Sequence, residues 1–446
     1  MTNLPAQLQR PTRHWVHRLV LSSVWLAGCC ASAAAPAENL QEAWYKAAHN
    51  DPLLAAAASD VAAATAERRA AQAGRLPTLT ASGSISRLSA SPALAFSTPD
   101  FAFRSPPLFA DDELRLGSVE LRLPLFTGGR LTAGIQAARA AERAADALHT
   151  SAGADLRLAV AAAYVEVLRA VRSHATAEAT VAGLASHHRD VTAMVEQDLV
   201  PMSDLLAAKV SLAHAEQQRL TASHTAALAL AAYNRQLGEP QDRVVNLEAI
   251  LPASLVSEAV PLTELIKTAV AARPELFALG SRTEQLSAEA TAEARRQWPQ
   301  LALTGGWQHV GSQLLDRQNY SMVGIGLQWQ LFDGGATRQR AAALRFAARA
   351  NAQRADDARS GVELQVRSAW LETHDAAARL QVAAAAMVEA AENERQSREQ
   401  YGAGLTSNTQ VLDAVRLRTA ASGDRDGAEF DLALSRLRLA HAIGAL

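Results

Sequence analysis

The sequence predicts a mixed α and β membrane protein in which one structural unit is written twice. The pentapeptide LFDGG at Leu331–Gly335 repeats LFTGG at Leu125–Gly129, 206 positions earlier (331 − 125). Just before each copy, apolar and polar residues alternate with the period of a half-buried strand. After each copy, helix-favouring sequence continues without proline through positions 130–194 and 336–400. A strand followed by a very long helix, twice over, is the predicted plan of the chain.

Residues 1–37 are predicted to be a secretory signal peptide. Three arginines precede the apolar stretch Leu19–Cys30, and small residues follow it, which is the order of a signal with its cleavage zone. Two processing routes stay open. Leu26–Cys29 resembles a bacterial lipobox, which would leave a lipidated Cys29 as the first mature residue, whereas ordinary cleavage within 33–37 would remove both cysteines. We favour ordinary cleavage, and neither route supplies a disulfide framework.

The duplication divides the mature chain into a first structural repeat at 38–238, a linker at 239–261 and a second repeat at 262–446. Each repeat should contain a helix, a β-hairpin, a long helix and a return helix. In the first repeat we place the hairpin at about 78–126, the long helix at 130–197 and the return helix at 203–237; in the second, these elements fall at about 300–332, 336–400 and 408–444.

The opening helix of the first repeat carries Pro52, which we expect to interrupt or restart it. Farther along, Pro77 and Pro299 correspond at an offset of 222 (299 − 77), which exceeds the offset of the pentapeptides by 16 (222 − 206). The surplus falls in residues 90–113, which are rich in Pro, Ser and Phe. We predict that this segment is a loop insertion, because loops tolerate added length.

The four predicted strands are about ten residues long, the length that crosses a bilayer at a tilt. In lipid every backbone polar group must be paired, so a sheet has to close on itself. Bacterial barrels contain an even number of strands, eight or more, so four strands per chain require two or three chains, and the physics alone leaves both possibilities open. We interpret Trp307 and Trp329 as members of an interfacial aromatic girdle, rather than as packing residues of a soluble sheet.

The two long helices would each extend about 100 Å at 1.5 Å per residue, far more than a bilayer is thick. Behind a signal peptide their natural place is the periplasm. Turns are predicted at 198–203 and 402–407. An apolar seam at coiled-coil spacing is formed by Val160, Tyr164, Val167 and Val171, and continues in the second copy at Val366 and Trp370.

The sequence resembles the TolC family of outer membrane channel proteins over essentially the whole mature chain. The stretches NDPLL, RLPTL, LPLFTGG, QLFDGG and YGAGLTSNTQVLDA carry the resemblance, in this order and with the plan repeated. The resemblance implies a homotrimer in the outer membrane, with a twelve-stranded β-barrel (four strands per chain) continued by a periplasmic α-helical barrel. It also implies docking, through a periplasmic adaptor, to an inner-membrane ABC or proton-driven transporter.

The function implied is that of an exit duct that carries exported substrates across the periplasm and outer membrane. We favour type I protein secretion, because the first helix begins soon after the signal, without a long extension. Multidrug or small-molecule efflux is the alternative. A rival from another class is a periplasmic coiled-coil adaptor or scaffold without a pore, which would explain the helices and the signal but not four alternating strands.

The resemblance also implies a gate at the periplasmic turns. Asp413 matches the inner of two acidic positions that ring the entrance, while the outer position falls on Gln410. Tyr401 and Asp204 match a hydrogen-bonded pair that holds the entrance closed. Because Gln410 carries no carboxylate, the ring should be less acidic than a doubled one. The family's arginine after the glycine falls on Thr406, so one ionic latch is missing.

The repeated pentapeptide is interpreted as a structural junction. The glycine pairs Gly128–Gly129 and Gly334–Gly335 give the backbone the freedom to turn from a strand into a long helix. Asp333 is predicted to cap the second helix, and Thr127 the first.

The sequence contains no enzyme signature. TGGR and DGGA lack the Lys-Ser/Thr of a phosphate loop, and a net charge of −2 gives no basic excess for nucleic acid. The histidines, His174, His187 and His188 among them, are expected at exposed helix positions rather than in a metal site. We therefore expect neither metal nor cofactor.

Overall fold

The computed structural model describes residues 37–109, 112–249, 260–312 and 315–446. The expected signal peptide and the candidate lipidation residue Cys29 lie outside the described residues. Among the residues that are described, no helix combines the length and apolar composition needed to cross a membrane.

The opening segment of the first repeat forms two helices, α1 (Leu40–Asn50) and α2 (Pro52–Ala73). Asn39 and Glu42 form a capping box at the start of α1. The Asp51 side chain accepts a hydrogen bond of 2.7 Å from the backbone of Leu54, and Pro52 takes the first helical position, where its missing N–H costs nothing. Pro52 therefore restarts the helix.

The duplication is visible in the lengths of the main helices. α3 (Arg130–Glu196) and α7 (Ala336–Gly402) each have 67 residues, and the return helices α4 (Met202–Gln236) and α8 (Asn408–Ala442) each have 35. Both return helices end two residues before a left-handed glycine, Gly238 with φ 69° and Gly444 with φ 76°, which stops the helix slightly earlier than expected. The second repeat opens with α5 (Leu262–Ala272), α6 (Pro274–Ala294) and the short η2 (Arg295–Gln297).

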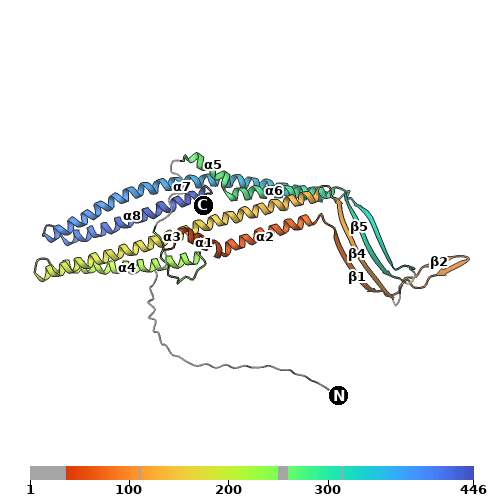
Figure 1. Cartoon of the computed structure of the whole chain (residues 1–446), viewed down its shortest axis with the longest axis horizontal. Coiled ribbons are helices and arrows are strands. Elements are labelled where there is room, and N and C mark those ends of the chain that lie inside the picture. The colour runs from red at the N-terminus through yellow and green to blue at the C-terminus, as the bar shows by residue number, and fades with distance from the viewer. Residues whose placement is uncertain (1–36, 110–111, 250–259, 313–314) are drawn as a thin grey trace, which may run out of the picture. The chain divides into compact units, whose positions relative to one another are not determined.

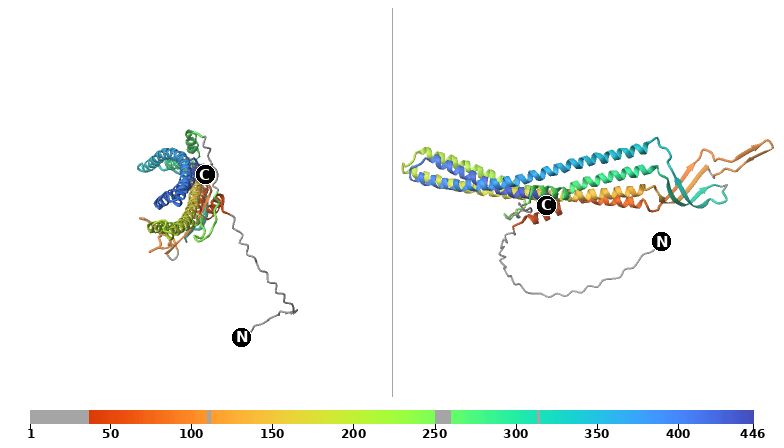
Figure 2. Two further views of the ribbon diagram at one scale, coloured as in Figure 1. Left: turned by 90° about the vertical axis from the view of Figure 1, so that its left-hand side faces the viewer. Right: turned by 90° about the horizontal axis from the view of Figure 1, so that it is seen from above.

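The long helices pack in pairs. Figures 1 and 2 show α3 with α4 and α7 with α8 as two antiparallel hairpins, and α3 also lies against α6 and α8. Each long helix follows directly from the β-sheet and runs to a turn, so the sheet and the turns lie at opposite ends of α3 and α7.

The main sheet has the strand order β1-β4-β5-β6, with every neighbouring pair antiparallel. Its strands are β1 (Thr78–Arg87), β4 (Glu113–Phe126), β5 (Gln300–Gly311) and β6 (Asn319–Gln328). The two hairpins of the duplication therefore join through β4 and β5, and β1 and β6 are the edges.

The strand register sorts the side chains by polarity, because residues directly opposite one another share a face. One row across the sheet contains Leu79, Leu121, Gly305 and Val323, and the adjacent row, on the other face, contains Thr80, Glu120, Gly306 and Met322. Trp307 pairs with Val119, on the apolar face. The alternation seen in single strands thus becomes one largely apolar face and one largely polar face of a sheet.

We predicted that the insertion at 90–113 is a loop, but part of it forms regular structure. It contains a second sheet of two strands, β2 (Ala95–Thr98) and β3 (Phe101–Arg104). Phe96 lies opposite Phe103, and Phe101 points to the same side, two residues from Phe103. These aromatic residues favour extended structure, a signal that the surrounding prolines obscured.

The last strand is shorter than the predicted hairpin at 300–332. β6 ends at Gln328, which pairs with Gln300, the first residue of β5. Within the described chain, Trp329 therefore has no residue of β5 to pair with. Its indole Nε1 instead donates a 3.0 Å hydrogen bond to the carbonyl of Gln297.

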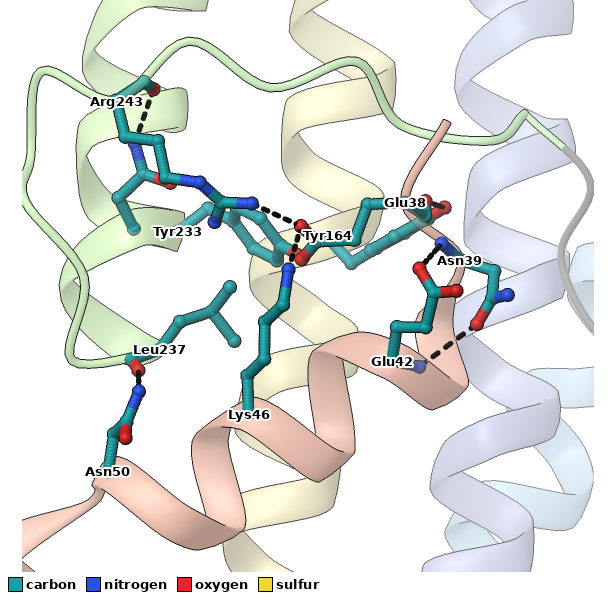
Figure 3. A network of polar contacts seen from close by, with 10 residues as sticks. Glu38, Asn39, Glu42, Lys46, Asn50, Tyr164, Tyr233, Leu237 and Arg243 are labelled. Atoms are coloured by element: carbon teal, nitrogen blue, oxygen red, sulfur yellow. Dashed lines mark hydrogen bonds and ion pairs between the residues drawn. The ribbon is translucent and has the colours of Figure 1, made fainter. Parts of the chain in front are cut away.

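The core near the middle of α3 is built around a buried carboxylate. Glu38, which is 3% exposed, accepts hydrogen bonds from Lys46 at 2.6 Å, Tyr233 at 2.7 Å and Arg243 at 2.5 Å (Figure 3). The hydroxyl of Tyr164 lies 2.9 Å from the carbonyl of Glu38 and 2.7 Å from that of Glu248. The cluster fastens the start of the described chain to α3, α4 and the segment after α4.

The predicted seam on α3 is buried at Val160, Tyr164 and Val167 but not at Val171, which is 54% exposed. The core cluster around Tyr164 extends along α3 only to Leu168. Val171 lies beyond it, whereas the neighbouring Ala170 is 3% exposed, so the buried face of α3 departs from the predicted seam at this point.

Candidate functional site

The two helix turns are corresponding elements of the two repeats. The amide of Leu199 bonds to the carbonyl of Met194 at 2.9 Å, and the amide of Leu405 bonds to that of Gln400 at 2.8 Å. Asp198 has φ 56° and Gly404, at the corresponding position, has φ 72°. Both turns reverse the chain through a left-handed residue, although one of them uses an aspartate.

Tyr401 and Asp204 meet beside these turns. The Tyr401 hydroxyl, on α7, donates to Asp204 Oδ2, on α4, at 3.2 Å. Burial, with the added effect of the Asp204 charge, raises the pKa of Tyr401 to about 12, so the phenol remains a donor at neutral pH. One contact thereby links the two helix hairpins.

Two residues that sequence reasoning missed complete this contact. Asn408, the first residue of α8, donates from Nδ2 to the carbonyl of Asp204 at 3.0 Å. Its Oδ1 lies 2.7 Å from Nε2 of His187 on α3. We expected His187 at an exposed position, but it is only 4% exposed. Its spacing between Leu184 and Val191, both buried, is the sequence signal that could have revealed it.

The expected entrance residues on α8 pair locally. Asp413 forms a 3.0 Å ion pair with Arg416, one turn along the same helix, and its side chain is 53% exposed. The Thr406 hydroxyl donates to Gln410 Oε1 at 2.5 Å. In the single chain, therefore, the Asp413 charge is partly balanced, and Thr406 and Gln410 form an uncharged side-chain pair at the start of α8.

A second polar cluster was also missed. Glu394 on α7 is buried and accepts hydrogen bonds of 2.8 Å from Arg398 on the same helix and from Arg418 on α8. The two guanidinium groups more than offset its burial and lower the pKa of Glu394. The cluster lines a small cavity of about 90 Å³ against α3, and its ion pairs join α7 to α8 within the second hairpin.

The four glycines of the strand-to-helix junctions all have left-handed backbones. Gly128 and Gly129 have φ 60° and 86°, and Gly334 and Gly335 have φ 67° and 85°. Asp333 accepts hydrogen bonds from the amides of Gly335 at 2.9 Å and Thr337 at 2.8 Å. The hydrogen bonds from Thr337 hold the pKa of Asp333 below its ordinary value.

The corresponding cap in the first repeat is weaker. Thr127 Oγ1 lies 3.5 Å from the amide of Leu131, at the limit of a hydrogen bond. The first junction is instead closed by packing, because a Cβ on Gly128 would lie 2.5 Å from Cβ of Trp298. No group of three His, Cys, Asp or Glu side chains that could hold a metal ion occurs among the described residues.

Comparison with known protein families gives one match, to the outer membrane efflux protein family, over residues 43–239 and 265–445. These ranges are most of both repeats. No match was found among curated protein sequences.

Comparison with solved structures gives outer membrane channels. The outer-membrane channel OprN shares 19% identity at a TM-score of 0.75, with 91% of this chain and 90% of that chain covered. The outer membrane protein VceC from Vibrio cholerae shares 16% identity at 0.77, with 91% and 96% covered. The open state of the MtrE channel from Neisseria gonorrhoeae shares 18% identity at 0.72, with 91% and 88% covered.

These similarities confirm the fold class expected from the duplicated sequence, with its helical hairpins and its β-domain. They also agree with placement in the outer membrane, with the helical part in the periplasm. The chain belongs to the outer membrane efflux protein family.

Proposed function

We propose that three copies of this chain form the exit duct of a tripartite export system, with a twelve-stranded barrel continued by a helical tunnel. The sorted faces of the main sheet are the observation that supports this most directly, since an apolar face suits lipid and a polar face suits a water-filled lumen. The edges β1 and β6 would pair between neighbouring chains, because an open sheet edge is not tolerated in lipid.

The duct would work with two partners. Diffusion through a pore needs no chemistry from the chain itself, so the energy comes from an inner-membrane ABC or proton-driven transporter. A periplasmic adaptor would join that transporter to the helix turns. The outer membrane lipids would surround the apolar face of the sheet.

Small-molecule efflux is the better supported export role, because the matching family is described by efflux. Type I protein secretion is the second candidate, and it is favoured by the start of α1 at Leu40, soon after the expected signal. Expression in a strain without its own efflux channel, together with the neighbouring transporter genes, separates the two. Restored drug resistance supports efflux, and export of a co-encoded protein supports secretion.

The Tyr401–Asp204 contact would hold the periplasmic entrance closed. Around a threefold axis, three Asp413 side chains would favour cations, although Arg416 beside each of them weakens that preference. The entrance is thus kept shut mainly by contacts between helix hairpins.

Tyr401→Phe or Asp204→Ala should therefore raise the single-channel conductance of the purified protein in a planar bilayer. Either change removes one charge-assisted hydrogen bond, worth about 1.5–3 kcal/mol, and so favours the open entrance. Tyr45→Phe, at an exposed tyrosine on α1, is the matched control and should leave the conductance as it was. Unchanged conductance in both gate variants would count against this gate.

A further inference from the structure

His187 lies where four helices converge near the turns. It is buried on α3, and its imidazole is 5.6 Å from the ring of Tyr401 on α7, between ring centroids. Its Nε2 contacts Asn408 on α8, and Asn408 in turn contacts Asp204 on α4. A change at this one side chain can therefore reach both hairpins.

The hydrogen bonds define which nitrogen carries the hydrogen in the neutral imidazole. Asn408 uses its amide N–H₂ group to donate to the Asp204 carbonyl, so its Oδ1 is the atom that faces His187. An amide oxygen only accepts, and His187 Nε2 must therefore carry a hydrogen. A neutral imidazole then leaves Nδ1 without a proton, so acid would add a charge and a new donor in a buried place.

The charges around His187 oppose one another. Asp190 on α3 and Asp204 on α4 favour the imidazolium, Arg398 on α7 disfavours it, and the contact from α8 is the neutral Asn408. Burial is the largest effect, and it lowers the pKa of His187 below its ordinary value of 6.5.

On the basis of the gate described above, we propose that His187 is a proton-operated positioning residue: its neutral imidazole suits the buried, closed arrangement of Asn408 and Asp204, and the charge gained on protonation favours the open arrangement, in which water can solvate it. The sign follows from linkage. The closed tip binds a proton less readily than an open, hydrated tip, so acidification below about pH 6.5 favours opening. For one group the ratio of open to closed tips can change at most about tenfold per pH unit.

Hydrogen–deuterium exchange of the intact assembled protein tests this without relying on transport. Peptides covering 184–205 and 401–415 should exchange faster at pH 5.5 than at pH 7.5, after correction for intrinsic exchange rates. His187→Gln keeps an amide donor toward Asn408 but cannot titrate, and it should abolish this pH response. His188→Gln, at the neighbouring half-buried histidine, is the matched control and should respond like the wild type.

A second variant keeps the proposal falsifiable if His187→Gln does not assemble. Asn408→Asp would place a carboxylate against Nε2 and favour the imidazolium in the closed tip, so the rise in exchange on acidification should shrink or reverse. An acid response in Asn408→Asp as large as that of the wild type, or an unchanged pH response in His187→Gln, would overturn the role of His187.

Single-channel conductance, measured at both pH values, distinguishes the positioning role of His187 from the proposed duct. If exchange follows the expected pattern but no conductance is seen at either pH, the duct fails and the positioning role stands. If the channel conducts but His187→Gln leaves the pH response of exchange intact, the duct stands and the positioning role is wrong.

Discussion

At the scale of single residues, Glu38 shows how a buried charge is made tolerable. Its carboxylate has three donors, two of them cationic, and these more than offset its burial, so that the pKa of Glu38 is lowered. A carboxylate without such partners would take up a proton instead. Replacement of Glu38 should therefore destabilise the fold, because Lys46 and Arg243 would lose the carboxylate that they share.

We therefore expect Glu38→Gln to lower the free energy of unfolding by about 1–3 kcal/mol, the cost of leaving buried charged donors poorly paired. The apparent midpoint of thermal unfolding, followed by circular dichroism, measures the change. Glu264→Gln is the matched control, since the pair of Glu264 with Lys267 is exposed and contributes little. Equal midpoints for Glu38→Gln and the wild type would contradict this account.

The difference between Glu38→Gln and the wild type should itself depend on pH. Because the pKa of Glu38 is lower in the folded chain, its contribution is present above the unfolded value of 4.5 and is lost as the pH falls through the folded value. The two midpoints should therefore converge in acid below pH 4.5.

At the scale of elements, the main sheet depends on one close approach of two strands. A Cβ on Gly306 of β5 would lie 2.5 Å from the carbonyl oxygen of Val119 on β4. The neighbouring Gly305 has room, since its Cβ would lie 3.7 Å from the nearest atom, the carbonyl oxygen of Met322. Position 306 therefore has no space for a side chain, whereas position 305 can accept a methyl group.

Gly306→Ala should separate β4 from β5 and sharply reduce the amount of heat-modifiable oligomer in membrane fractions. Gly305→Ala should assemble to within about twofold of the wild type, because 3.7 Å is an ordinary van der Waals contact. Equal yields from the two variants would show that the approach of β4 to β5 does not limit assembly.

The elements also show what a sequence can and cannot reveal. The period of two, the absence of proline and the repeated pentapeptide predicted the sheet and the long helices, because these signals are local. The end of β6 at Gln328 depends on where β5 begins, and the exposure of Val171 depends on which face of α3 its neighbours cover. No local pattern records either of these. The β2–β3 hairpin was missed because prolines outweighed its alternating phenylalanines.

In the candidate gate, too, some residues could be predicted from the sequence and others could not. The pair Tyr401 and Asp204 was expected from resemblance to a family, and the structure brings the two residues into contact. His187 and Asn408 come from different repeats and were not associated. A histidine in an apolar seam can be a buried hydrogen-bonding group or a surface residue, and only the tertiary contacts distinguish the two.

At the scale of the whole molecule, the proposed trimer makes a prediction about the sheet edges. A cysteine at Ser82 or at alternate neighbouring positions of β1, combined with one at Met322 of β6, should give disulfides between chains on oxidation. The ladder should end at three chains on a non-reducing gel. A ladder ending at two chains would indicate an eight-stranded barrel instead.

Ser118→Cys on β4 combined with the same β6 cysteine is the control. β4 lies at least two strands from any copy of β6, or about 10 Å, and a disulfide needs Cα atoms within about 7 Å. Crosslinks from this pair at the level of the β1 pair would mean that the edges are not where the strand order places them.

The unpaired edges of the four-stranded sheet also bear on how the protein reaches its final state. In the proposed duct a lone chain cannot complete its lipid-embedded part, because half of the backbone groups on β1 and β6 would face hydrocarbon. Insertion would then require encounters between chains, so its rate should rise steeply with the concentration of newly exported chains. Biogenesis, and not only stability, would be cooperative in the number of copies.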